Sequence, residues 1–185
     1  MEAGGKSTAP GELELVRQFL NTLDIEDGIE EIGTPAKLGA WLAEHGLTDG
    51  RHLDDGDVQR AIAMREGLRA LTLANNGEPL PGDALSRLNS IAGEARLRVR
   101  FDERGRPALE PAGAGPEAAL GELLSIVFQS MAAGTWPRLK ACRADTCQWV
   151  FYDHSKNRSG TWCSMAVCGN RAKARSYRTR HRHEE

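Results

Sequence analysis

The sequence predicts a mainly α-helical protein with a small β-hairpin, followed by a separate C-terminal module built around four cysteines. Apolar residues recur with a helical period through most of the first 135 residues, and one short stretch alternates like a strand. All four cysteines lie between residues 142 and 168. The chain has 185 residues, 40% of them hydrophobic, which is enough to bury the core of a larger domain beside this module.

Four helices are expected in the first part of the chain. The second has the clearest boundaries, because Thr34 can cap it, Pro35 suits its first turn and Gly46 suits its end. The third begins with Asp54 or Asp55 as the N-cap, since a short acidic side chain accepts hydrogen bonds from the first helical N–H groups. The expected bounds are Leu13–Leu23, Thr34–Gly46, Asp54 or Asp55 to the Asn75-Asn76-Gly77 stop, and Pro81 to near Gly93.

A hairpin and a fifth helix complete the N-terminal domain. Leu97–Phe101 alternates apolar and basic residues, Asp102–Arg106 is a turn, and Pro107–Pro111 can return as a partner strand. Pro116–Ala133 is the most apolar helix, and its apolar residues cover more than one face. This helix is therefore either the central core helix or a dimer surface. Gly134–Pro137 breaks it.

The cysteines form two equal pairs, Cys142 with Cys147 and Cys163 with Cys168, separated by fifteen residues. Two close pairs joined by a loop of hairpin size can place four thiolates at the corners of a tetrahedron, as one structural Zn2+ requires. The alternatives are two disulfides or four unrelated core thiols. Disulfides need an oxidising compartment, whereas the sequence has no secretory h-region and no apolar run of membrane-spanning length. We therefore expect zinc, a cytoplasmic location and no membrane partner.

The residues around the cysteines indicate how the module folds. Gln148–Tyr152 is predicted to be a strand, Asp153–Gly160 a polar turn, and Thr161 the start of a returning strand. If Ser164 is the N-cap of the following helix, the second cysteine pair occupies the two positions that touch at a helix start. A knuckle, a hairpin and a helix in this order are typical of a treble-clef-like zinc finger.

Charge is divided between the two parts of the chain. Residues 1–137 carry 13 Lys or Arg against 22 Asp or Glu, a net charge of −9, while residues 138–185 carry 11 against 4, a net of +7. Arginines recur on one face of the predicted last helix, which suits contact with phosphates. A solvated basic tail is the alternative. The expected nucleic-acid contacts are Asn170, Arg171, Lys173, Arg175, Arg178, Arg180 and Arg182.

The segment Cys168-Gly-Asn-Arg171, together with Trp162, the Phe151-Tyr-Asp153 stretch and the cysteine spacings, resembles the CGNR zinc finger over about residues 138 to 182. In bacterial proteins this finger follows an ABATE domain, and the family is described as stress-induced transcription regulators. The resemblance implies that the four cysteines bind zinc and that the basic helix binds DNA.

The resemblance to the ABATE domain rests on shorter segments. They are Phe19-Leu-Asn-Thr22, the Trp41 helix ending in Gly46-Leu47, Arg65 with Leu68, and Leu88-Asn89. Four polar residues in these segments lie near apolar faces and can converge on a pocket for a small-molecule effector: Asn21, Thr22, Arg65 and Asn89. Alternatively, these side chains cap helices and satisfy buried backbone groups.

The expected organisation is a disordered segment at 1–11, a helical ABATE-like domain at 12–135 for ligand sensing or dimerisation, and a zinc finger at 138–183. The expected function is a zinc-dependent transcription regulator that binds duplex DNA as a homodimer. RNA binding through the same helix and a protein-interaction module are the alternatives. An enzyme is not expected, because the sequence has no Gly-rich phosphate loop, His-Glu-x-x-His or Gly-x-Ser-x-Gly motif.

Overall fold

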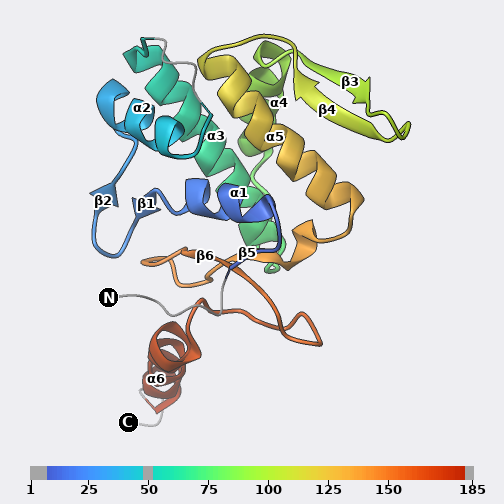
Figure 1. The fold of residues 1–185 in the computed structure, drawn as a ribbon. Helices are drawn as coiled ribbons and strands as arrows, with labels where there is room; N and C mark the ends of the chain where they lie inside the picture. Colours follow the sequence, from blue (N-terminus) through green and yellow to red (C-terminus); the bar gives the residue numbers. More distant parts are fainter. Residues whose placement is uncertain (1–7, 48–51, 182–185) are drawn as a thin grey trace.

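The computed structural model describes residues 8–47 and 52–181. Over these ranges the chain forms six α-helices and three two-stranded antiparallel sheets, which confirms the mainly α fold class (Figure 1). The helices are α1 (Leu13–Leu20), α2 (Pro35–Glu44), α3 (Asp55–Ala74), α4 (Gly82–Glu94), α5 (Pro116–Ala132) and α6 (Asn170–His181). The strands are β1 (Leu23–Asp24), β2 (Ile29–Glu30), β3 (Leu97–Phe101), β4 (Pro107–Pro111), β5 (Leu139–Ala141) and β6 (Val150–Tyr152). Two short helical turns are η1 (Trp136–Arg138) and η2 (Met165–Gly169).

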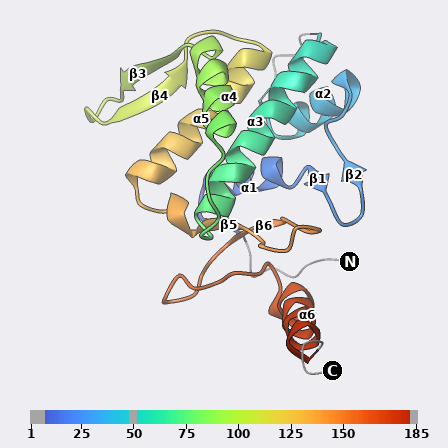
Figure 2. The same ribbon diagram turned by 180° about the vertical axis from the view of Figure 1, so that it is seen from behind.

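The body of the molecule is a helical bundle centred on α3. This helix contacts α1, α2, α4, α5 and β5, and the two ribbon views show α2 on one side of the bundle and the β3–β4 hairpin on the other (Figures 1 and 2). α5 also lies within the bundle, where it contacts α1, α3, α4, β4 and η1. The buried face of α5 includes Leu123, while Phe128 and Met131 are exposed.

Local sequence signals set the starts of the helices. The Thr34 hydroxyl accepts a hydrogen bond from the Lys37 N–H at the start of α2. Asp54 and Asp57 form a reciprocal capping box at the start of α3, with N···O distances of 2.9 and 2.8 Å. Within α3, Gly67 allows α4 to approach closely, because a Cβ at this position would lie 2.8 Å from Cγ of Leu88. The two caps explain why the predicted starts of α2 and α3 agree with the structure.

The end of α1 differs from the prediction. The helix stops at Leu20 rather than Leu23, because Leu23 pairs with Glu30 in the β1–β2 sheet. Residues 8–11 also differ, since they were expected to be disordered with the rest of 1–11. Ala9 is buried, and its N–H donates to a Glu14 carboxylate oxygen at 2.7 Å. Residues 1–7 lie outside the described part of the chain.

The strand pairing of the C-terminal module is the main correction. β6 was expected to pair with a strand returning at Thr161, but it pairs instead with β5, which precedes the first cysteine pair. The turn between β5 and β6, residues 142–149, closes this hairpin, so the loop at residues 153–160 does not connect paired strands. Leu139, Ala141 and Val150 are fully buried in the same core cluster as the helices of the body. The β5–β6 hairpin therefore belongs to both the module and the body.

The last helix projects away from the rest of the molecule. Figures 1 and 2 show α6 below the β5–β6 hairpin, at the end opposite α2 and α4. The side chains described after Ala172 in α6 are exposed. Within residues 8–47 and 52–181, none of the helices combines the length and the apolar character that crossing a bilayer requires.

Candidate metal centre

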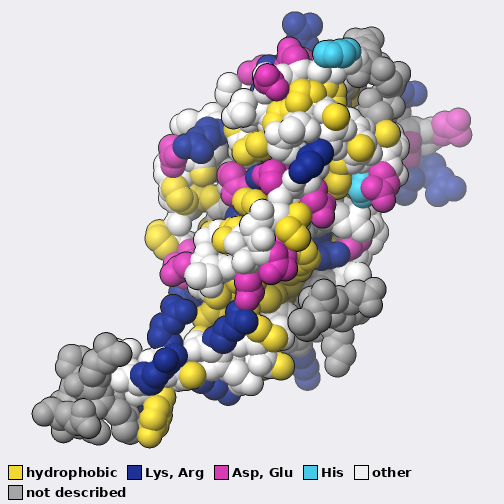
Figure 3. Space-filling model, turned by 90° about the vertical axis from the view of Figure 1, so that its left-hand side faces the viewer, with side chains coloured by type: hydrophobic (Ala, Val, Ile, Leu, Met, Phe, Trp, Pro, Cys, Tyr) yellow, Lys and Arg dark blue, Asp and Glu magenta, His cyan; other side chains and the backbone are white. Residues whose placement is uncertain are grey.

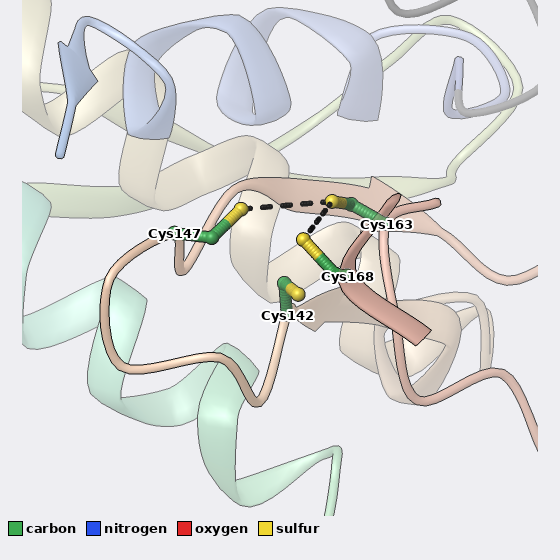
Figure 4. Close-up of side chains that lie close together, drawn as sticks. All are labelled: Cys142, Cys147, Cys163 and Cys168. Atoms are coloured by element: carbon green, nitrogen blue, oxygen red, sulfur yellow. Dashed lines mark hydrogen bonds between the residues drawn. The ribbon is translucent and has the colours of Figure 1, made fainter. Parts of the chain in front are cut away.

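The first cysteine pair lies on a tight knuckle at the end of the β5–β6 hairpin. The Cys142 N–H donates to the Trp149 carbonyl at 3.0 Å, which continues the ladder beyond β5. The N–H groups of Cys147 and Gln148 both donate to the Ala144 carbonyl, at 2.8 and 3.0 Å. These bonds turn the chain so that the two sulfurs face the same space (Figure 4).

The second cysteine pair lies at the start of the last helical segment. The Ser164 side chain accepts a hydrogen bond from the Val167 N–H at 3.3 Å, so the predicted N-cap is confirmed. The Gly169 N–H donates to the Ser164 carbonyl at 3.1 Å, which makes η2 a wide, π-helical turn. This turn places Sγ of Cys168 3.7 Å from Sγ of Cys163.

The four sulfurs form one cluster with the dimensions of a zinc site. Sγ of Cys147 lies 3.6 Å from Sγ of Cys163, and all four Sγ atoms lie within 4.8 Å of one another (Figure 4). A Zn–S bond of about 2.3 Å in a tetrahedron gives S···S distances of about 3.8 Å. A disulfide needs about 2.05 Å, so the sulfurs are not paired as disulfides. The cysteines thus fit one structural Zn2+ with four thiolate ligands.

The electrostatics of the cluster also favour a cation. Hydrogen bonds from the Cys147 and Cys163 thiols lower the pKa of Cys142. Hydrogen bonding to the Cys142 sulfur in turn raises the pKa of Cys147 and of Cys163, and burial raises the pKa of Cys168. Without a metal, one thiolate therefore makes the other three harder to form. A divalent cation at the centre removes this repulsion.

Comparison with known families agrees with this geometry. The family model for the CGNR zinc finger matches residues 138–181. The ABATE model, described as "Putative stress-induced transcription regulator", matches residues 13–139, which is more than half of the chain. The chain belongs to the ABATE family. Its C-terminal CGNR finger binds one structural zinc ion, as the cysteine spacing predicted, and neither family is one of enzymes. No curated protein matches the chain.

Four side chains of the ABATE body hold the backbone of the CGNR finger. The Asn21 side chain accepts a hydrogen bond from the Val150 N–H at 2.8 Å and donates one to the Val150 carbonyl at 2.9 Å. Arg69, which is 2% exposed, donates to the Gln148 carbonyl at 2.9 Å. The remaining contacts to the finger come from Asn75 to the Leu139 carbonyl and from Asn76 to the carbonyls of Ala141 and Thr161. Asn75 also donates to the carbonyl of Trp136, just before the finger.

Sequence reasoning did not assign Arg69, Asn75 or Asn76 to the finger. All three lie in or directly after α3, and the two asparagines were interpreted only as the stop of that helix. Their bonds to the C-terminal module go to backbone carbonyls 61 or more residues away in the chain. The sequence carries no signal for such contacts, because a backbone carbonyl can accept from any donor that the fold brings near it.

The structure brings together three of the four residues predicted to line an effector pocket in the ABATE body. Arg65 donates to the Thr22 hydroxyl at 3.2 Å and forms an ion pair with Glu30 at 2.7 Å, and Asn21 is the neighbour of Thr22. All three are buried, and their polar groups bond to protein atoms. Asn89 is exposed on α4 and does not join them. Two surface depressions among the described residues, one lined by Ser90 and Glu94 and the other by Leu15 and Glu122, include none of the four.

The predicted nucleic-acid residues of the CGNR finger lie at or after the start of α6. The Asn170 amide donates to the Ala166 carbonyl at 3.1 Å and so joins η2 to α6. Arg171 forms an ion pair with Glu26 in the β1–β2 loop. The other predicted residues within the described range are exposed: Lys173, Arg175, Arg178 and Arg180. Arg182 lies outside the described residues.

Proposed function

We propose that this ABATE-family protein is a bacterial, cytoplasmic transcription regulator that binds duplex DNA through α6. The structural zinc supplies the cross-link that joins the knuckle to the start of η2 and α6. The ABATE body would then regulate binding, either by sensing a small-molecule effector or by forming a homodimer. The observation that carries the proposal is a projecting helix whose exposed charged side chains are all basic.

The shape and charge of α6 support contact with DNA. A free α-helix has the diameter that the major groove of B-DNA admits, and α6 projects from the body as a recognition helix must. Figure 3 shows lysine and arginine side chains, in dark blue, at the lower end of the molecule, below the acidic side chains of the body in magenta. Such a division of charge directs a polyanion to the finger and away from the body.

The N-terminal end of α6 already holds an acidic group where a phosphate would bind. The Arg171 guanidinium contacts the Glu26 carboxylate, and both side chains are about half exposed, at 57% and 41%. An exposed ion pair of this kind is weak, so a DNA phosphate can replace the carboxylate at little cost. The pair supports the proposal, because the Arg171 guanidinium already contacts one oxyanion, the Glu26 carboxylate.

The four aromatic residues around the cysteines favour duplex DNA over unpaired RNA, although Tyr177 on α6 is exposed. Single-stranded RNA is recognised largely by bases that stack on exposed aromatic side chains. Phe151 and Tyr152 are buried, and Trp149 and Trp162 pack against the cysteine cluster. Trp149 and Trp162 therefore pack in the small core of the finger, and Tyr152 packs in the core of the body. A protein-interaction role for α6 stays the second candidate, because Arg171 contacts one acidic side chain of the body, Glu26.

Salt dependence of binding tests this proposal. If α6 contacts about four to six phosphates, log K for a duplex should fall with log[salt] at a slope of about −4 to −5. Replacing Arg175 and Arg178 with alanine should bring the slope closer to zero by about 2, because two phosphate contacts are lost. Both side chains are exposed, so folding should not change. A wild-type slope near zero, or no effect of the two substitutions, would contradict the proposal.

A further inference from the structure

The loop at residues 153–160, here called the finger loop, has no role in the function proposed for α6. It joins β6 to the second cysteine pair, and residues 154–159 are all exposed. Figures 1 and 2 show this loop and α6 on the side of the β5–β6 hairpin that faces away from the bundle, with the loop towards one edge and α6 towards the other. A ligand that spans this end of the molecule can therefore reach both.

A buried ion pair fixes the base of the finger loop. Lys140 and Asp153 side chains are only 5% and 3% exposed, and Nζ lies 2.8 Å from Oδ2. The same ammonium donates to the carbonyls of Arg158 and Gly160, at 2.6 and 3.1 Å, so all three of its protons are used. A buried pair is costly unless its remaining hydrogen bonds are made, and here they are made by the loop.

Further contacts leave the loop little freedom. The Asp153 carboxylate accepts hydrogen bonds from the N–H groups of Ser155 and Gly160, at 3.0 and 2.8 Å. Arg138 donates to the carbonyls of Asp153 and Ser155, at 2.8 and 2.9 Å. Gly160 has no space for a side chain, because a Cβ would lie 2.9 Å from the Asp153 carboxyl carbon. The loop is thus held in one conformation although its outer side chains contact solvent.

The outer surface of the finger loop is basic. The only acidic residue of the loop, Asp153, is neutralised inside by Lys140. Lys156 and Arg158 are exposed, and within the described residues neither takes part in an ion pair. Several exposed arginines of the body are paired with acids: Arg87 with Asp83, Arg100 with Glu110 and Arg106 with Asp102. Arg98 and Arg104 on the β3–β4 hairpin are exposed without an ion pair among the described residues, as Lys156 and Arg158 are, but they lie far from α6 (Figures 1 and 2). The loop therefore presents two cations for an external anion.

We propose that the finger loop is a second phosphate-binding element, in which Lys156 and Arg158 contact the DNA backbone at a distance from α6. This inference rests on the function proposed above. A loop already held in one conformation loses little entropy on binding, so its two charges contribute efficiently. Phosphate contacts fix the register and orientation of a protein on a duplex. Contacts at two edges of this face of the hairpin would fix the angle at which the projecting α6 meets the groove.

The test combines two substitutions in the loop, Lys156→Ala and Arg158→Gly. Glycine is chosen for position 158 because its φ of +52° favours glycine, so the charge is removed without strain. With zinc-loaded, full-length protein, we expect about tenfold weaker binding to duplex DNA and a salt slope closer to zero by about 2. The matched control, Arg98→Ala with Arg104→Ala, removes two exposed charges from the β3–β4 hairpin and should leave both values unchanged.

The outcomes separate the loop from the proposed function. If the loop variant keeps the wild-type affinity and slope while Arg175→Ala with Arg178→Ala weakens binding, the loop inference is wrong and the role of α6 stands. If the wild-type protein does not bind duplex DNA, both proposals fail. If the loop variant loses affinity together with zinc content or melting temperature, the loop has a structural role and the inference is overturned. Reduced affinity and slope with unchanged zinc content and melting temperature support it.

Discussion

Replacing Cys147 with serine is expected to unfold the CGNR finger and to lower the melting temperature of the ABATE body as well. A structural zinc contributes on the order of 10 kcal/mol to the folding of a small module at neutral pH. The loss should extend beyond the finger, because Leu139, Ala141 and Val150 are fully buried in the core of the body. The helices α2 to α5 keep most of their own contacts and should stay formed, but with lower stability.

Circular dichroism and hydrogen exchange together test this expectation. We expect Cys147→Ser to lower the midpoint of thermal unfolding by about 10 °C or more, since each kcal/mol shifts the midpoint of a chain of this size by about 2–4 °C. Amide exchange should accelerate in β5, β6 and α6 and, to a smaller extent, in α1 and α3. Thr161→Ser, a conservative change in the same module, is the control and should keep its zinc. A zinc-free Cys147→Ser protein that melts like the wild type would contradict the structural role of the metal.

Replacing Asp153 with asparagine is expected to have the second-largest effect. The substitution leaves the Lys140 ammonium buried opposite a neutral side chain, and breaking a buried pair in this way costs about 3–5 kcal/mol. Adding Lys140→Met should restore part of this stability, because the unpaired charge is then absent. The control Asp83→Asn breaks an exposed pair and should cost less than about 1 kcal/mol. Chemical denaturation of the zinc-loaded proteins measures all four values.

The same pair gives a defined pH dependence. Burial opposes ionisation of Asp153, but hydrogen bonds from Lys140, Ser155 and Gly160 outweigh it and hold the pKa of this carboxyl below its usual value. The unfolded chain binds the proton near pH 3.9, so the stabilisation is complete above about pH 5 and is lost as the pH falls below about 4. The difference in unfolding free energy between wild type and Asp153→Asn should therefore be constant near neutral pH and shrink in acid. A difference that grows in acid would contradict this assignment.

The parts of the fold that the sequence predicted well depend on local signals. Thr34 and Asp54 cap helices through residues three positions away, so the starts of α2 and α3 follow from short stretches of sequence. The bounds of the β3–β4 hairpin were also predicted correctly, since alternation and a five-residue turn define them. The metal centre was predictable for the same reason, because its ligands are recognised by type and spacing.

The parts that could not be predicted depend on contacts between distant segments. β6 pairs with β5 because this hairpin packs in the core of the body. The sequence of residues 148–152 alone does not indicate that packing. Asn21 was proposed as a pocket residue, but its amide is used by Val150, 129 positions away. Every residue offers the same backbone N–H and C=O groups, so the sequence does not indicate which side chain will form hydrogen bonds with them. Nothing in the structure tests the predicted roles of Lys173, Arg175, Arg178 and Arg180, which stay predictions.

The most direct test of the central claim is a selection from random duplex DNA with purified, zinc-loaded protein at about physiological salt, where nonspecific phosphate binding is weak. A chelated sample and the Arg175→Ala, Arg178→Ala variant are run in parallel. We predict that the zinc-loaded wild type enriches one DNA motif and that neither of the other two samples enriches it. Two copies of this motif at a fixed spacing would indicate that the protein binds as a dimer. The contradicting result is no enrichment, or the same enrichment after the zinc has been removed.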